Sequence, residues 1–249
     1  MVEKIDINLD DPGIYSRLDP DDMLKHIRNF PSLCDQAWQK ARDFRLPEKY
    51  TQVKKVVILG MGGSAIGGDL VSSLAVNESG IPVMVCRDYN LPQYVDGETL
   101  VIASSYSGMT EETLSSFEQG FDTGAKMLAI TTGGKLQSLC ETMGVPVFNI
   151  DYRSQPRAAL PFSFFTLLAI LQNLGLMPNK DQEVAGSLES MNRMKERIDF
   201  TVPEKDNPAK SLARKLAGRL PVIYGAGITG EVAHRWKTQI NENSKTMCF

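Results

Sequence analysis

The sequence predicts an α/β protein: a three-layer α/β/α sandwich around a parallel sheet. Between residues 53 and 150, short apolar runs of strand length alternate with segments of helical periodicity. Short apolar strands joined by helical crossovers indicate a parallel sheet that is covered on both faces. A glycine-rich turn joins the first strand to the first helix. The chain has 249 residues, 42% of them hydrophobic, which is enough for one or two domains with a substantial core.

Helices are expected before the sheet. Asp19, Asp21 and Asp22 are acids at a helix start, where they complement the positive end of the helix dipole. Apolar residues then recur at helical spacing as far as Phe44, and Pro31 is expected to split this stretch into two helices that pack on the following domain.

The alternating pattern assigns each element of the sheet region in order. We expect strands at 56–59, 82–86, 99–103, 126–130 and 145–150, and helices at 69–74, 111–120 and 136–143. Ligands of such sheets bind beyond the carboxyl ends of the strands.

Three further helices are expected after the sheet. Residues 161–174 are apolar enough for a helix buried between layers, and Pro208 suits the first turn of a helix that ends before Gly218. The helix at 182–198 is more polar, and its predicted inner face contains Leu188, Met191, Met194 and Ile198.

The stretch Pro221–Gly230 repeats the order of strand, glycine turn and helix that is found after Val56. Only one strand and one helix of this second copy precede Phe249, so we expect a fragment of a longer protein. The predicted division is a helical segment at 1–50, a first domain at 51–155, connecting helices at 156–218, and the start of a second domain at 219–249.

Two loops are candidate ligand sites. The turn after the first strand includes Gly63 and Ser64, and a glycine turn at a helix N-terminus presents unpaired N–H groups to an anion such as phosphate. The segment after the third strand contains Ser105, Ser107 and Thr110, whose hydroxyls can donate to phosphoryl oxygens. The structural alternatives are a tight turn without a ligand and ordinary capping of the next helix by Ser107.

These residues resemble the sugar isomerase (SIS) domain, and more narrowly the bifunctional phosphoglucose/phosphomannose isomerases, which consist of two SIS domains. The resemblance rests on 60–64, 105–113, 156–158 and the distinctive stretch 241–245. It implies a flavodoxin-like parallel sheet, a phosphorylated hexose as substrate, a homodimer, and neither metal nor redox cofactor.

The resemblance also implies a role for each matching residue. Gly63, Ser64, Ser105, Ser107 and Thr110 would hold the sugar phosphate. Arg157 would stabilise the enediolate charge, and Glu242 would be the general base that moves a proton between C1 and C2. From the residues alone, Glu242 could be a solvated acid at a helix end, and Arg157 could pair with Asp151.

The sequence departs from the family pattern at Met109, where the family usually has asparagine, and this removes a polar side chain from the phosphate loop. The family's ring-opening histidine and a late lysine would fall beyond Phe249, and His234 is not in the matching place. We therefore expect this chain by itself not to complete the isomerisation.

Composition argues against several other classes. A net charge of −3 does not favour nucleic acid binding, and the longest apolar stretch is too short to cross a membrane. Two histidines and four scattered cysteines make a zinc site improbable. The N-terminus lacks a signal-peptide pattern, so a cytoplasmic protein is expected.

Two alternative functions stay open. Gly225, Gly227 and Gly230 fit the GxGxxG pattern of a dinucleotide-binding oxidoreductase, and Asp88 ends the second strand where a ribose-binding acid would lie. The second alternative is a protein that binds sugar phosphate without catalysis.

Overall fold

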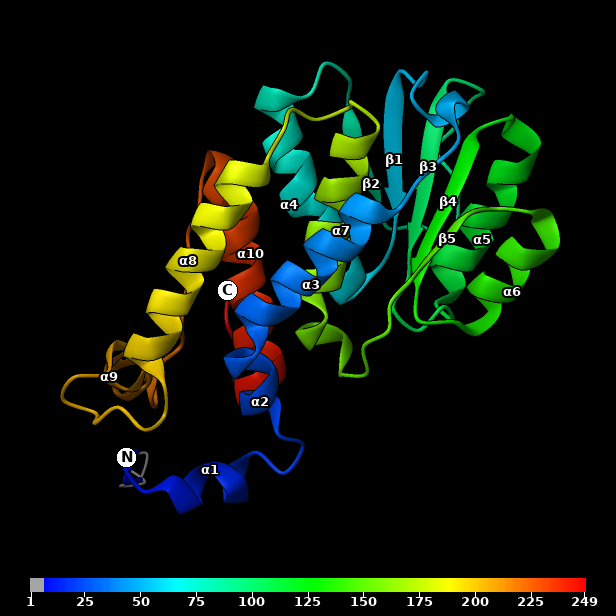
Figure 1. Ribbon diagram of the computed structural model, residues 1–249. Coiled ribbons are helices and arrows are strands. Elements are labelled where there is room, and N and C mark those ends of the chain that lie inside the picture. The colour runs from blue at the N-terminus through cyan, green and yellow to red at the C-terminus, as the bar shows by residue number, and fades with distance from the viewer. Residues whose placement is uncertain (1–6) are drawn as a thin grey trace.

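The computed structural model describes residues 7–249 and has a five-stranded sheet with helices on both faces (Figure 1). The strand order is β2-β1-β3-β4-β5 and every pairing is parallel, which confirms the predicted flavodoxin-like sheet. The strands are β1 (Lys55–Leu59), β2 (Val83–Cys86), β3 (Thr99–Ser104), β4 (Lys126–Thr131) and β5 (Val147–Asn149).

Alternate residues of each strand face opposite sides of the sheet, and both sides are apolar. Val56 and Ile58 belong to the core on one side, whereas Val57 and Leu59 belong to the core on the other. The first core lies under α3 (Phe30–Asp43), α4 and α7 (Leu160–Asn173), and the second lies under α5 and α6 (Figure 1). This pattern explains why the strands are continuous apolar runs. The crossover helices are α4 (Gly62–Glu78), α5 (Glu111–Gln119) and α6 (Gly134–Met143).

Of the helices before the sheet, α3 packs against the first of these cores, as predicted, whereas α2 has no buried residue and contributes none to it. Asp19 accepts hydrogen bonds from the backbone N–H groups of Met23 and Leu24 at 2.8 and 2.7 Å, and so caps the predicted helix start. The break falls at Asn29, and Pro31 lies in the first turn of the next helix, where it is tolerated. The sequence did not predict α1. The helices are α1 (Pro12–Leu18), α2 (Met23–Arg28) and α3 (Phe30–Asp43).

Helix α4 begins at Gly62, seven residues before the predicted start at Asp69, so most of the glycine-rich turn is helical. Its glycines serve packing in part. A Cβ added at Gly67 would lie 2.7 Å from the Cβ of Ser163 on α7 (Leu160–Asn173), so α4 and α7 approach too closely for any side chain there. The buried helix predicted at 161–174 is confirmed as α7.

The remaining helices are α8 (Asp181–Ile198), α9 (Pro208–Leu216) and α10 (Gly230–Ser244). The predicted inner face of α8 is wrong at Met194, whose side chain is 47% exposed. The physical reason is an open apolar cavity of about 670 Å³, which Met191, Met194 and Ile198 line together with α2, α9 and α10. No helix in residues 7–249 combines the length and apolar composition needed to span a membrane.

The strand predicted at the start of the second unit is absent: residues 221–226 form no strand in the described chain. Their ladder contacts are limited to Phe249, whose carbonyl accepts from the N–H of Ile223 at 2.7 Å and whose N–H donates to the carbonyl of Pro221. A strand needs a continuous partner, and residues 7–249 offer none at this edge. The predicted helix does form, as α10, and it packs on α4.

Candidate functional site

The site predicted from the two loops lies where the chain changes direction across the sheet. After β1 the chain crosses to β2 on one side, and after β3 it crosses to β4 on the other. Such a switch point opens a crevice at the carboxyl ends of the strands. A Cβ added at Gly60 would lie 2.8 Å from the carbonyl oxygen of Ser104, so the loops that follow β1 and β3 are in direct contact.

Ser64 and Gly63 lie in the first turn of α4 at this crevice. The hydroxyl of Ser64 accepts a hydrogen bond from the backbone N–H of Tyr106 at 3.1 Å, which joins the two loops. A Cβ added at Gly63 would lie 3.0 Å from the carbonyl oxygen of Pro156, so this glycine lets α4 contact the segment with Arg157. No side chain caps α4. The N–H of Ser64 donates to the carbonyl of Met61, which leaves the N–H groups of Gly62 and Gly63 available to an anion.

The hydroxyls of the β3 loop point in different directions. Ser105 is buried, accepts from the N–H of Gly108 and shares a 3.1 Å hydrogen bond with the hydroxyl of Thr110. Ser107 is exposed, and its hydroxyl accepts from the N–H of Met109. The N-cap of α5 is Thr110, and no side chain caps this helix, so Ser107 does not serve as the cap that the structural alternative required.

The β4 loop holds the β3 loop in place. The carbonyl of Tyr106 accepts from both the N–H and the hydroxyl of Thr132, and the carbonyl of Gly108 accepts from the N–H of Leu136. Met109 is 49% exposed, and its sulfur accepts a weak hydrogen bond from the N–H of Lys135 at 3.4 Å. The departure from the family pattern is therefore accommodated at the rim, without disturbing Ser105 or Thr110.

Arg157 lies in a single 3-10 turn, Pro156–Ala158, that precedes α7. Its Nε donates to the side-chain oxygen of Asn243 at 2.8 Å. Asp151 pairs with Lys40 instead, so the alternative pairing of Arg157 with Asp151 is not formed.

Glu242 is exposed on the last turn of α10, beside Asn243. Its charge acts on Arg235, a half-buried residue of the same helix: burial lowers the pKa of Arg235, and the carboxylate of Glu242 opposes that shift. Arg235 also donates to the carbonyl of Arg157. Arg157 thus contacts α10, the helix that contains Glu242, through Asn243 and Arg235. No hydrogen bond or ion pair joins Arg157 to Glu242 itself in residues 7–249.

Sequence reasoning missed three residues that shape this site. Asn243 lies inside the stretch that carried the family resemblance, and its position beside Glu242 was the available signal. Tyr106 lies inside another such stretch, 105–113, but its partner Tyr152 is distant in sequence, and Arg235 gave no signal.

Tyr106 braces the segment that leads to Arg157. Its hydroxyl donates to the carbonyl of Tyr152 at 2.6 Å and accepts from the N–H of Ser154 at 2.7 Å. We expect Tyr106→Phe to lower the free energy of unfolding by about 1–3 kcal/mol, because two backbone groups lose their partner. Affinity for a sugar phosphate should also fall, because the loop and the Arg157 segment loosen together.

The matched control is Tyr50→Phe. The hydroxyl of Tyr50 donates to the carbonyl of Met127 at 2.9 Å in the core, away from the site. Urea denaturation should show a comparable loss of stability in this control, and ligand titration should show unchanged affinity. Equal affinities for Tyr106→Phe and wild type would contradict the bracing.

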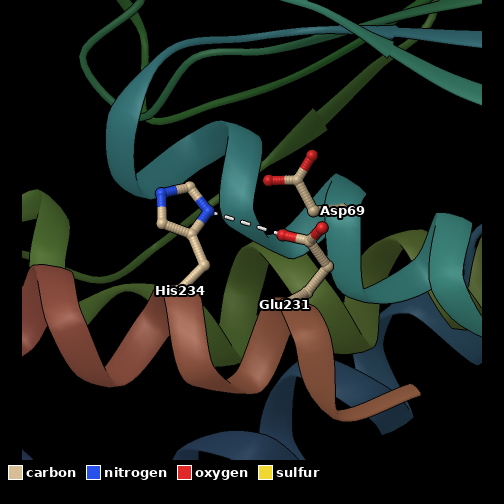
Figure 2. Close-up of side chains that lie close together, drawn as sticks. All are labelled: Asp69, Glu231 and His234. Carbon is tan, nitrogen blue, oxygen red and sulfur yellow. Dashed lines mark hydrogen bonds and ion pairs between the residues drawn. The ribbon is translucent and has the colours of Figure 1, made fainter. Parts of the chain in front are cut away.

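One cluster of potential metal ligands occurs in the described residues, at the contact of α4 and α10. Figure 2 shows Asp69 beside Glu231 and His234, with their ligand atoms within 4.8 Å of one another. Asp69 already pairs with the guanidinium of Arg87, and His234 Nδ1 lies 3.4 Å from Glu231 Oε2. Because a bound cation would compete with Arg87, we interpret the cluster as a polar contact that joins α10 to α4.

Known structures of low sequence identity share this fold. A putative phosphosugar isomerase from Clostridium difficile superposes with a TM-score of 0.63 at 14% identity, covering 97% of this chain and 68% of the other. The profile described as "Bacterial phospho-glucose isomerase C-terminal SIS domain" matches residues 205–249. These comparisons show the shared fold and a SIS-domain match at residues 205–249.

Curated relatives narrow the class. The bifunctional phosphoglucose/phosphomannose isomerase of Caldicellulosiruptor bescii is 45% identical over 228 residues, covering 91% of this chain and 67% of the relative. The Aquifex aeolicus protein of the same name is 37% identical over 200 residues, covering 80% of this chain and 58% of the relative. The chain belongs to the bifunctional phosphoglucose/phosphomannose isomerase family, and it spans about two thirds or less of the length of these relatives.

Proposed function

We propose that this chain forms the phosphate-binding and proton-transfer part of an aldose–ketose isomerase. Its substrates would be fructose 6-phosphate, glucose 6-phosphate and mannose 6-phosphate. The observation that supports this most is the contact, at the β1/β3 switch point, between an uncapped helix N-terminus, a loop of hydroxyls and the segment with Arg157. A cytoplasmic homodimer is part of the proposal, and it rests on the family resemblance.

The proposed chemistry is a proton transfer between adjacent carbons. The carboxylate of Glu242 takes a proton from C1 of the open-chain ketose, the C–H electron pair forms a C1–C2 double bond, and the carbonyl oxygen at C2 becomes an enediolate oxygen. Arg157 stabilises this negative charge. The proton of O1 then passes to the enediolate oxygen on C2, and return of the carbon-bound proton to C2 leaves a carbonyl at C1 and a hydroxyl at C2, which is the aldose. The face on which C2 is protonated decides between the glucose and mannose epimers. Glu242 is thus assigned the proton transfers at carbon, and Arg157 the stabilisation of the enediolate.

A thermal-shift titration tests the proposal. A ligand that binds only the folded state at a hundredfold excess over Kd raises the free energy of unfolding by roughly 2.7 kcal/mol. Fructose 6-phosphate should raise Tm and NAD should not. A shift with NAD alone would overturn the proposal in favour of the oxidoreductase alternative. That alternative lacks its structural context here, because within residues 7–249 the segment directly before the GxGxxG turn, 221–224, is not a strand.

We expect Ser107→Ala to weaken binding of fructose 6-phosphate by about tenfold to hundredfold, because a hydrogen bond to a charged group contributes about 1.5–3 kcal/mol. The exposed hydroxyl of Ser107 is free to donate to a phosphate while it accepts from Met109. Calorimetric titration measures the change. The control is Ser115→Ala on α5, whose hydroxyl donates to the carbonyl of Tyr89. Unchanged affinity in Ser107→Ala would show that the phosphate binds at a different place in the protein.

A further inference from the structure

The guanidinium of Arg157 is only partly engaged. Nε donates to Asn243, whereas the two terminal nitrogens have no hydrogen-bond partner within residues 7–249. No carboxylate in the same range forms an ion pair with Arg157, although its side chain is half-buried. A cation with its terminal N–H groups unpaired is suited to bind oxygens of a ligand in a fork geometry.

Helix α10 holds this arginine at two points. Asn243, on its last turn, accepts from the side chain at 2.8 Å, and Arg235, two turns earlier, donates to the backbone carbonyl. Glu242 lies between these contacts in sequence, next to Asn243. The helix that presents the proposed base therefore also fixes the proposed cation.

We propose that Asn243 is a positioning residue that orients the guanidinium of Arg157 toward the enediolate oxygens. The inference deepens the proposed function and rests on it. An amide oxygen fits this task because it accepts the Nε hydrogen and leaves the positive charge of the arginine uncompensated. A carboxylate at 243 would neutralise that charge, and an alanine would free the side chain to rotate.

The test compares two ligands that share a phosphate and differ at the reacting carbons. A five-carbon sugar-phosphate hydroxamate mimics the charged enediolate, whereas sorbitol 6-phosphate has no such charge. Asn243→Ala should lower the affinity for the hydroxamate by about tenfold. The affinity for sorbitol 6-phosphate should stay within about twofold of wild type, because the phosphate loops are unchanged. Asn243→Asp should weaken the hydroxamate further. The control is Ser244→Ala, an exposed neighbour on the same turn, which should change neither affinity.

A double-mutant cycle separates positioning from general disruption. In an Arg157→Ala background, Asn243→Ala should cause no further loss of hydroxamate affinity, because the residue acts through Arg157. An equal loss in both backgrounds, or an equal loss for both ligands, would overturn the inference. If Arg157→Ala itself leaves hydroxamate affinity unchanged, the role proposed for Arg157 in the isomerase is wrong. This result differs from failure of the Asn243 inference, in which Arg157→Ala weakens hydroxamate binding and Asn243→Ala does not act through Arg157.

Discussion

Glu242→Gln is expected to abolish proton exchange at C1 of fructose 6-phosphate while substrate affinity stays nearly constant. Glutamine keeps the shape of the side chain and removes its basicity, and loss of a general base typically lowers a rate by about 10²- to 10⁴-fold. Exchange of the C1 proton with D₂O, followed by NMR, suits this chain because it requires only the base, the cation and the open-chain ketose present in solution. It does not require the ring-opening group.

The exposure of Glu242 makes this experiment informative. The solvated-acid interpretation of the sequence fits an exposed carboxylate equally well, and only the rate distinguishes the two. Glu231→Gln is the matched control, since it removes another carboxylate of α10 from a position outside the proposed site. If Glu242→Gln exchanges the C1 proton at nearly the wild-type rate, Glu242 is not the general base.

The sheet was predictable because its signal is local. The central strands β1, β3 and β4 are apolar runs with both faces buried, and each crossover helix has its own periodicity. The start of α4 was less predictable. Glycine is a poor helix former, yet Gly67 is required inside this helix by the approach of Ser163 from α7, a tertiary cause that the local pattern cannot reveal.

The second unit shows the same limit more clearly. The stretch at 221–226 has the composition of a strand, but a strand depends on its neighbour, and within residues 7–249 its ladder hydrogen bonds are limited to Phe249. Helix α10 needs no such neighbour for its hydrogen bonds, and it forms as predicted.

The sequence predicted which loops form the candidate site, but it did not predict the contacts between distant segments. Ser105 and Thr110 are close in sequence, so their shared hydrogen bond follows from the loop. The contact between Arg157 and Asn243 joins residues 86 positions apart, and composition gives no indication of it. The roles assigned to all these residues remain proposals that the experiments above test.

Gly108→Ala is expected to have the largest effect on stability and on phosphate binding together. Gly108 has φ +64°, in the left-handed region, and an added Cβ would lie 1.8 Å from the carbonyl oxygen of Gly133. The left-handed conformation costs a non-glycine residue roughly 1–2 kcal/mol. The clash adds to this by forcing apart the loops after β3 and β4, so we expect a total loss of about 3 kcal/mol or more.

Substitutions at two further glycines separate the conformational cost of Gly108→Ala from the cost of its steric clash. Gly144 has φ +67° and nothing within 4 Å of an added Cβ, so Gly144→Ala should show the conformational cost alone. Gly186 lies inside α8 in open space without positive φ, so Gly186→Ala should stabilise by roughly 0.5–1 kcal/mol. Urea denaturation measures all three, and a Gly108→Ala loss no larger than that of Gly144→Ala would show that the two loops separate without cost. The affinity for fructose 6-phosphate should fall in Gly108→Ala alone, because only this substitution displaces the backbone between Ser107 and Thr110.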